Sequence, residues 1–359
     1  MSRVAIIDTA IDINCINANK VEFISLCENS KQSKNHKVNH GTLCASILDF
    51  CTTNYELVNI QIFGENRNKV FCEIDLLEKA LSLCKTLEVD IVSLSAVSST
   101  LSDSKHLYDI TCQLCEHTIV VSALDNKQYI TIPTSYPFVI GVRNDVANML
   151  RPGEIAFNET DPFSANDIAN CNFDFLNNLK KRPSNSFAVP VVAAYFNDLL
   201  NKGFTKQYVN QIGKTLSPYS VCEESICFVP LSSGKVPIVL VLDSEVDTCR
   251  SLLSDMHEKH GIQATALSLL DCCYDLRIKT VKNANSLANE ISFMEHHYKT
   301  DVIFIICTQD SREFINQTVD VDLELNNLNN EHVFMCYDKK QEVHPGSSIP
   351  DRIYEILTQ

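Results

Sequence analysis

The sequence predicts an α/β protein with a mostly parallel central sheet, followed by a small doubly wound α/β domain. Three observations support this fold class. The chain has 359 residues, 45% of them hydrophobic, which is enough for one full core and a further domain of roughly 140 residues. Apolar, mostly β-branched runs such as residues 4–7 are typical of buried parallel strands. Strands and helices alternate again beyond Gly234. Strands are expected at 237–243, 262–267, 301–307 and 332–337, and helices are expected up to about 260, near 284–298 and at 349–357.

The first apolar run ends in an aspartate, and two other polar residues begin predicted helices. Asp8 closes the first strand, at the carboxyl edge of the sheet where α/β proteins bind ligands. His40 and Ser186 each precede apolar residues at helical spacing, which places both near helix N-termini. We expect Pro190 in the first turn after Ser186, where N–H groups lack intrahelical partners.

An acid, a base and a nucleophile in this order predict a serine hydrolase. A serine hydroxyl is a poor nucleophile, so Ser186 needs His40 as a base and Asp8 to orient that base. Taken singly, each residue also fits a structural role, because strands often end in Asp and a serine before a helix is often an N-cap. Together, the order Asp, His, Ser is that of subtilisin and not that of chymotrypsin or the α/β-hydrolases.

Residues 2–200 resemble the subtilisin-like serine peptidases (subtilases) in several ordered segments. The matching segments are 4–9, 40–45, 56–63, 90–95, 120–126 and 136–142. The resemblance implies a three-layer subtilisin-like fold in a form that lacks a prodomain. It also implies an oxyanion hole at Asn126 and a substrate cleft formed by Ser95, Ala96, Val97, Ala123, Leu124 and Asp125.

The oxyanion hole also follows from the chemistry. A tetrahedral intermediate carries an oxyanion, which the Asn126 side-chain amide and the Ser186 backbone N–H can stabilise. The alternative is that Asn126 is only a loop residue that tolerates turn geometry.

Several residues depart from the subtilase pattern. The chain has only 9 glycines, and other residues replace usual family glycines or flank the nucleophile, namely Ala10, Val97, Asp125, Ser184, Asn185 and Phe187. Because Val97 narrows the expected cleft, we predict a restricted specificity. Asp125 either faces the pocket and favours a Lys or Arg before the cleaved bond, or faces solvent as a turn residue.

Charge and cysteine content limit the function classes. A net charge of −15 and a pI near 5.1 argue against nucleic-acid and anionic-membrane partners; they favour a basic peptide partner or serve solubility alone. No apolar run approaches the roughly 20 residues that span a bilayer. With Asp8 so early, we expect neither a secretory signal nor a prodomain.

The sixteen cysteines predict reduced thiols and a cytoplasmic protein. We expect buried thiols at Cys44, Cys84, Cys112, Cys115 and Cys307. No cofactor and no metal is predicted, because the Cys112–Cys115 pair lacks a second pair and residues 51–56 are too short for the calcium loop of many subtilases.

The predicted organisation is a peptidase domain at 1–215, a linker at 216–234 and a small α/β domain at 235–359. A last helix of the first domain is expected near 206–216. The second domain has no phosphate-binding loop, since two carboxylates follow Asp243 within four residues. His296 and His297 are expected to be structural. Peptide recognition or formation of a homo-oligomer is the expected role of this domain.

The function predicted from these residues is a cytosolic serine endopeptidase that forms an acyl-enzyme on Ser186 and has few substrates. Removal of the leader from a ribosomally made peptide natural product fits the resemblance to small subtilases with appended domains. The alternative is a catalytically inactive protein that keeps the fold and holds a peptide in the cleft. The glycine replacements favour this alternative, whereas the intact set of Asp8, His40, Asn126 and Ser186 favours catalysis.

Overall fold

The structure is a computed structural model that describes residues 1–27, 39–64, 72–206, 236–282, 284–326, 328, 332–337 and 340–358. The chain divides into two compact units, and each is described by itself. The predicted linker 216–234 and most of the helix expected near 206–216 lie outside the described residues. Among the described residues, no helix is both long and apolar enough to cross a membrane.

The first unit contains an eight-stranded sheet in the order β2-β3-β1-β4-β5-β6-β8-β7. All its paired strands are parallel except β7 with β8. Its strands are β1 (Ser2–Asp8), β2 (Lys20–Ser25), β3 (Tyr55–Gln61), β4 (Ile91–Leu94), β5 (Ile119–Ala123), β6 (Ile140–Asn144), β7 (Ile155–Phe157) and β8 (Asp167–Ala169). Its helices are α1 (His40–Cys51), α2 (Ile74–Thr86), α3 (Ser104–Cys115), α4 (Asp174–Asn178) and α5 (Asn185–Asn201).

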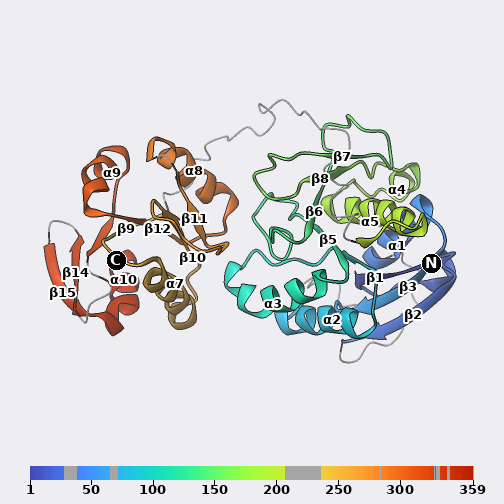
Figure 1. The fold of residues 1–359 in the computed structure, drawn as a ribbon, viewed down its shortest axis with the longest axis horizontal. Coiled ribbons are helices and arrows are strands. Elements are labelled where there is room, and N and C mark those ends of the chain that lie inside the picture. The colour runs from blue at the N-terminus through green and yellow to red at the C-terminus, as the bar shows by residue number, and fades with distance from the viewer. Residues whose placement is uncertain are drawn as a thin grey trace. The chain divides into compact units, whose positions relative to one another are not determined.

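Helices cover both faces of this sheet, which gives three layers (Figure 1). Helices α1 and α5 lie on one face, and α2 and α3 lie on the other. Helix α5 crosses the sheet and contacts β1, β4, β5, β6 and β8. Because strand side chains alternate between faces, Val4 and Ile6 of β1 belong to the core shared with α1 and α5. The predicted α/β class with a mostly parallel central sheet is confirmed.

The second unit contains a seven-stranded sheet in the order β11-β10-β12-β9-β13-β14-β15. The five strands from β11 to β13 are parallel, and a hairpin of β14 and β15 extends the sheet. Its strands are β9 (Ile238–Leu242), β10 (Ala264–Ser268), β11 (Ile278–Thr280), β12 (Val302–Cys307), β13 (Leu323–Asn326), β14 (His332–Tyr337) and β15 (Lys340–Pro345). Its helices are α7 (Val246–His260), α8 (Leu287–His297), α9 (Arg312–Thr318) and α10 (Ile349–Leu357).

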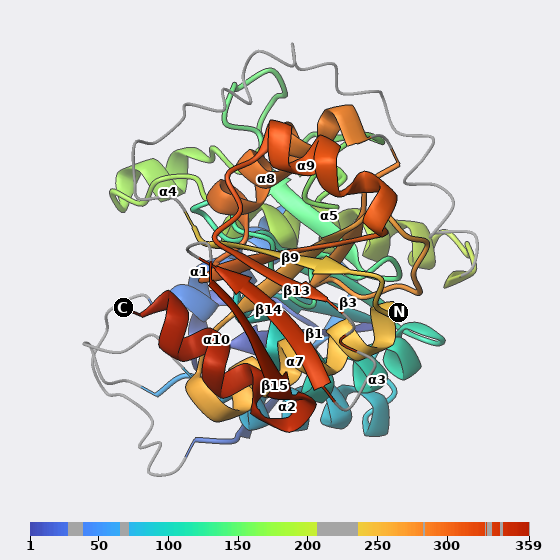
Figure 2. The ribbon, with the colours of Figure 1, turned by 90° about the vertical axis from the view of Figure 1, so that its left-hand side faces the viewer.

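The second unit also has helices on both faces, α7 and α10 on one and α8 and α9 on the other (Figure 2). Sequence patterning predicted α7, α10 and the parallel strands β9, β10 and β12 near their observed bounds. It missed β11, β13, β15 and α9, which are short or partly polar. The Asp243 carboxylate accepts the Gln309 N–H at 2.9 Å, and Nδ1 of His296 lies 2.6 Å from the carbonyl of Ser292.

The cysteines of the described residues are free thiols. Cys44, Cys84 and Cys307 are buried, as predicted. The prediction is wrong for Cys112 and Cys115, which are only half-buried. They flank the buried face of α3, which consists of Leu107, Thr111 and Leu114.

A glycine allows α1 to approach the end of β1 closely. A Cβ atom on Gly41 would lie 2.5 Å from the carbonyl oxygen of Thr9. Gly41→Ala is therefore expected to lower the free energy of unfolding by about 1–3 kcal/mol, measured by urea unfolding under reducing conditions. Gly64→Ala is the control, because a Cβ there meets no atom within 4 Å. Equal unfolding midpoints for the two variants would contradict the close approach.

Asp167 on β8 is a buried carboxylate outside the predicted site. It is 4% exposed, and its Oδ1 atom has no hydrogen-bond partner among the described residues. Burial raises the pKa of Asp167 from 3.8 to about 7 because it disfavours the charged form. The folded state therefore holds this proton more tightly than the unfolded state does.

This difference predicts that the protein loses stability as the pH rises. Asp167 contributes its full stabilisation below pH 3.8 and loses it progressively as the pH approaches about 7. A three-unit shift corresponds to at most about 4 kcal/mol. Asp167→Asn should remove this dependence and stabilise the protein at pH 8, in urea unfolding compared at pH 5 and pH 8. The exposed Asp109→Asn is the control; a wild-type pH dependence in Asp167→Asn would refute the prediction.

Candidate active site

Alternation along β1 orients Asp8. Val4, Ile6 and Asp8 share one face of the strand, and Val4 and Ile6 pack into the core shared with α1 and α5. The carboxylate therefore points toward α1 instead of toward α2 and α3. It is buried and accepts the Thr9 N–H on Oδ1 at 2.7 Å.

A buried asparagine holds the chain that follows Asp8. Asn59 lies beside Ile6 in the register of β1 and β3. Its amide donates to the Thr9 carbonyl at 3.2 Å, and its oxygen accepts the Ile11 N–H at 3.0 Å. Because Asn59 is fully buried, this brace fixes the turn that carries the Asp8 carboxylate.

The start of α1 is attached to the same turn. Asn39 is the N-cap and accepts the Thr42 N–H at 2.9 Å, and its amide donates to the Ala10 carbonyl at 2.5 Å. Thr9 Oγ1 accepts the Gly41 N–H at 2.8 Å. His40, the first residue of α1, is therefore held against the end of β1.

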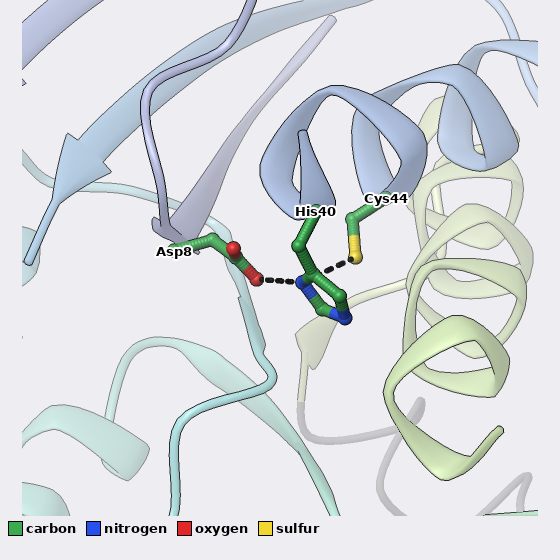
Figure 3. A group of neighbouring side chains, drawn as sticks. All are labelled: Asp8, His40 and Cys44. Carbon is green, nitrogen blue, oxygen red and sulfur yellow. Dashed lines mark hydrogen bonds and ion pairs between the residues drawn. The ribbon is translucent and has the colours of Figure 1, made fainter. Parts of the chain in front are cut away.

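Asp8 and His40 form a short hydrogen bond at this junction. Oδ2 of Asp8 lies 2.7 Å from Nδ1 of His40 (Figure 3). The Asp8 side chain is 2% exposed and that of His40 is 39% exposed. The imidazole is thus anchored on its buried side and accessible on the other. With Nδ1–H donating to the carboxylate, Nε2 is left as the basic nitrogen.

The surroundings favour the protonated imidazole. Burial opposes the charge on His40, but hydrogen bonds with Cys44 and Asp8 and the negative charge of the Asp8 carboxylate outweigh burial and raise the pKa of His40 above 6.5. Burial raises the pKa of the Cys44 thiol above its usual value, so this sulfur is uncharged at neutral pH. Asp8 is therefore the negative charge that stabilises an imidazolium on His40.

Ser186 is the second residue of α5, and its carbonyl oxygen lacks the usual helical donor. Because α5 begins at Asn185, Pro190 lies in the second turn, which corrects the expectation that it lies in the first. Proline has no N–H for the carbonyl four residues earlier. The Ser186 carbonyl instead faces Ser95 Oγ at 3.4 Å and Cys44 Sγ at 3.8 Å.

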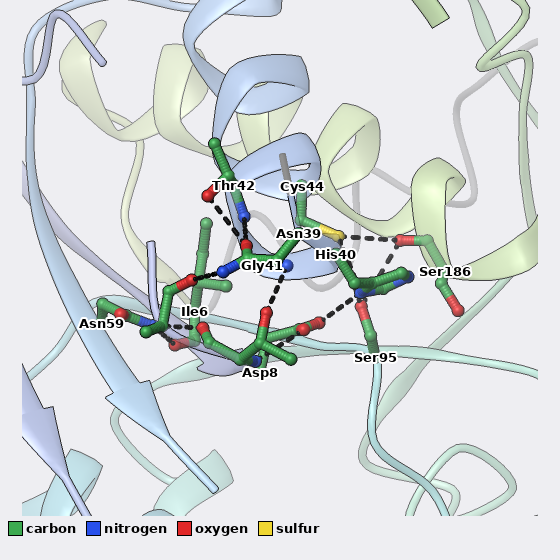
Figure 4. Close-up of polar contacts among 12 residues, drawn as sticks. Ile6, Asp8, Asn39, His40, Gly41, Thr42, Cys44, Asn59, Ser95 and Ser186 are labelled. Carbon is green, nitrogen blue, oxygen red and sulfur yellow. Dashed lines mark hydrogen bonds and ion pairs between the residues drawn. The ribbon is translucent and has the colours of Figure 1, made fainter. Parts of the chain in front are cut away.

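The imidazole lies between Asp8 and Ser186 in Figure 4. Its ring stacks on Phe187, with centroids 5.1 Å apart and an interplanar angle of 20°. Among the described residues, the hydrogen bonds of His40 go to Asp8 and Cys44 and not to the Ser186 hydroxyl. Such bonds are often long without substrate and shorten when it binds.

Asn126 and Asn185 connect β5 with the start of α5. Asn126 Oδ1 accepts the Asn185 N–H at 3.0 Å, so the Asn126 amide donor is directed elsewhere. The Asn185 side chain donates to the Leu124 carbonyl at 3.0 Å and accepts the Asn144 N–H at 2.9 Å. The Ser186 N–H lies in the first turn of α5, where N–H groups have no intrahelical partner. The Asn126 amide and the Ser186 N–H are thus two donors at the start of α5 that none of these hydrogen bonds uses.

The predicted substrate residues follow neighbouring strands. Ser95, Ala96 and Val97 follow β4, whereas Ala123, Leu124 and Asp125 end or follow β5. Because β4 and β5 are parallel neighbours, both groups lie at the same edge of the sheet. Ala96, Ala123 and Leu124 are buried, whereas Val97 and Asp125 are half-exposed.

The Asp125 carboxylate takes part in a turn. Its Oδ1 atom accepts the Lys127 N–H at 2.7 Å, which is the hydrogen bond of an Asx-turn. This hydrogen bond matches the alternative in which Asp125 is a turn residue and does not face the substrate pocket. The preference for a Lys or Arg before the cleaved bond stays a prediction.

Two groups of described side chains could hold a metal ion. Asp8, His40 and Cys44 form one group, and Asp75, Glu78 and His106 form the other, each with ligand atoms within 4.8 Å of one another. In the first group the donors already interact with each other. The second lies on α2 and α3 and is partly exposed. The sequence prediction of no metal did not consider either group.

No protein-family model and no curated protein matches this chain. Solved structures with a similar fold include a lanthipeptide protease, with 15% identity and a TM-score of 0.44 over 59% of this chain and 78% of the other. They also include a mutant of the protease domain of PatA, with 18% identity and a TM-score of 0.42 over 59% of this chain and 85% of the other. A third is the prenylagaramide maturation protease PagA, with 15% identity and a TM-score of 0.39 over 58% of this chain and 81% of the other. At these identities the likeness concerns the fold alone.

Sequence reasoning missed three supporting side chains of the site. Cys44 was assigned only to the core, although its spacing of four from His40 on a helix could have placed it beside the imidazole. Asn185 was noted as a departure from the family, without its role between β5 and β6. Asn59 had one signal, since it is a polar residue between the apolar Val58 and Ile60 of β3.

Proposed function

We propose that this protein is a subtilisin-like serine endopeptidase that cleaves peptide bonds through an acyl-enzyme on Ser186. The observation that supports it most is the 2.7 Å bond between the buried Asp8 carboxylate and His40 Nδ1. This bond leaves Nε2 of a half-exposed imidazole as the base, next to the helix that carries Ser186.

In this mechanism the Ser186 hydroxyl attacks the peptide carbonyl while His40 Nε2 accepts its proton. Asp8 stabilises the resulting imidazolium. The oxyanion accepts hydrogen bonds from the Asn126 amide and the Ser186 N–H. His40 then donates the proton to the leaving amine, and a water molecule hydrolyses the acyl-enzyme by the same steps in reverse order.

The proposed substrate is a peptide with a restricted sequence around the cleaved bond. Val97 and Asp125 occupy positions where resembling enzymes keep glycine, which narrows the set of accepted side chains. The sequence resemblance to maturation enzymes favours a ribosomally made precursor peptide that loses its leader. The reduced cysteines favour action in the cytoplasm.

Labelling with a fluorophosphonate probe, followed by intact mass spectrometry, tests the serine chemistry. One adduct is expected on the wild type and none on Ser186→Ala. A folded wild-type protein without an adduct would contradict the proposal and favour an inactive peptide-binding protein. Incubation of a proteome-derived peptide library with the labelled and unlabelled enzyme then tests peptidase activity.

A further inference from the structure

Three consecutive basic residues precede the helix of the proposed nucleophile. Lys180, Lys181 and Arg182, together called the basic segment, are all exposed. Among the described residues, none of the three side chains forms an ion pair or a hydrogen bond. The chain as a whole carries a net charge of −15. The local charge of the basic segment is therefore opposite in sign to the net charge of the protein.

The backbone of the basic segment is fixed where helix α4 ends. The Lys180 N–H donates to the Asn177 carbonyl at 2.9 Å, and the Lys181 N–H donates to the Leu176 carbonyl at 2.9 Å. These two bonds form a Schellman motif with Lys180 at the left-handed position, φ +55°. Two of the three charged side chains therefore start from a defined backbone.

The conformation of Lys180 adds a second observation. Glycine is favoured at this position, because other residues lose about 1–2 kcal/mol in the left-handed region. A lysine here gives up stability that a glycine would supply.

The basic segment lies within reach of a bound peptide. Arg182 precedes Ser186 by four residues, so their Cα atoms are at most about 14 Å apart. An extended peptide advances about 3.3 Å per residue. A substrate held at Ser186 can therefore reach Arg182 with residues within about five positions of the cleaved bond.

From this placement we infer that the basic segment binds an acidic stretch of the peptide substrate, within about five residues of the bond cleaved at Ser186. This inference rests on the proposed function and names its substrate class. It also modifies the expectation of a basic partner, which was based on the net charge of the whole chain. Charge complementarity at the site depends on local side chains, because salt screens charges beyond about 8–10 Å.

Peptide binding to the Ser186→Ala protein tests the inference without requiring catalysis. The probes are a fluorescein-labelled dodecapeptide of Ala, Gly and Ser with four central Glu residues, and the same peptide with four Gln residues. Fluorescence anisotropy should show about tenfold tighter binding of the Glu peptide at low salt, since each exposed ion pair changes affinity by up to about fivefold. The preference should shrink at 0.3 M salt.

A matched pair of triple variants locates the effect. Lys180→Glu, Lys181→Glu and Arg182→Glu together should abolish the preference for the Glu peptide. Lys20→Glu, Lys85→Glu and Lys202→Glu change the net charge equally at exposed positions. These lysines lie toward the amino ends of the strands, away from the carboxyl edge that carries Asp8, because β2 begins there and α2 and α5 end there. This control should keep the preference. If the first variant does not fold, the corresponding Gln substitutions replace it.

Three outcomes would overturn the inference. The first is equal binding of the Glu and Gln peptides, and the second is an equal loss of the preference for the Glu peptide in both triple variants. The third is displacement of the labelled Glu peptide by a dodecamer of uridine at a lower concentration than the unlabelled Glu peptide requires, which would indicate a nucleic-acid partner. Fluorophosphonate labelling of the same variants, with Ser186 restored, is the separate readout of the proposed function. A failure of catalysis and a failure of acidic recognition can thus be distinguished.

Discussion

Replacing Asp8 with asparagine is expected to slow the reaction of Ser186 by about four orders of magnitude. The carboxylate accepts the Nδ1–H of His40 at 2.7 Å, whereas an asparagine amide would donate there and leave the proton on Nε2. Such an imidazole cannot accept the serine proton. The pseudo-first-order rate of fluorophosphonate labelling, measured against pH, reports this loss directly.

The same pH profile has a second expected feature. Only the neutral imidazole accepts a proton, and the pKa of His40 is raised above 6.5. The wild-type rate should therefore increase with pH through a midpoint above 6.5, and Asp8→Asn should move that midpoint to lower pH. Asp109→Asn, an exposed change on α3, is the control. A midpoint unaffected by Asp8→Asn would mean that Asp8 does not set the charge of His40.

Asn126→Ala is expected to lower kcat by about 10²- to 10³-fold with little change in KM. In the proposed mechanism the Asn126 amide donates to the oxyanion, and its orientation is set by its own oxygen, which accepts the Asn185 N–H. Hydrolysis of a chromogenic peptide ester selected by library profiling is the measurement. An equal reduction of kcat and rise in KM would indicate a general disturbance of the cleft.

Asn126→Asp separates the two roles of this side chain. An aspartate keeps an oxygen for the Asn185 N–H but offers no donor, and its charge repels the oxyanion. We expect a kcat below that of Asn126→Ala, together with wild-type thermal stability. If Asn126 only braced the start of α5, the aspartate variant would instead retain nearly full activity.

The sequence was sufficient for the main layers because each depends on a local pattern. The apolar run 4–7 lies within β1, which ends at Asp8 as predicted, and α1 begins at His40 as predicted. The last helix, 349–357, was predicted with its observed bounds because its apolar residues lie on one side. By contrast, β13 and β15 contain Glu324, Asn326, Lys340 and Glu342, which weaken their apolar pattern. The pairing of β13 also depends on β9, which is far away in the chain.

The site was predictable as a set of residue types but not as a network. Asp8, His40, Ser186 and Asn126 were selected by type and order, and local periodicity explains the direction of Asp8. The hydrogen bonds of Ser95 and Asn185 depend on where α5 crosses the sheet, which no local pattern encodes. Likewise, Pro190 could be assigned to a helix, but only the observed start at Asn185 shows that it frees the Ser186 carbonyl.

Helix α5 has a consequence for how the protein is made. It covers the apolar face of five strands and also carries Ser186, and its Asn197 side chain hydrogen-bonds Ser2 at the beginning of β1. On the ribosome, β1 emerges before α5, and nearly two hundred further residues must be synthesised before α5 can cover it. The central core and the proposed nucleophile are therefore completed at the same stage of synthesis. A nascent chain that has not yet released α5 therefore has an incomplete core and lacks the proposed nucleophile.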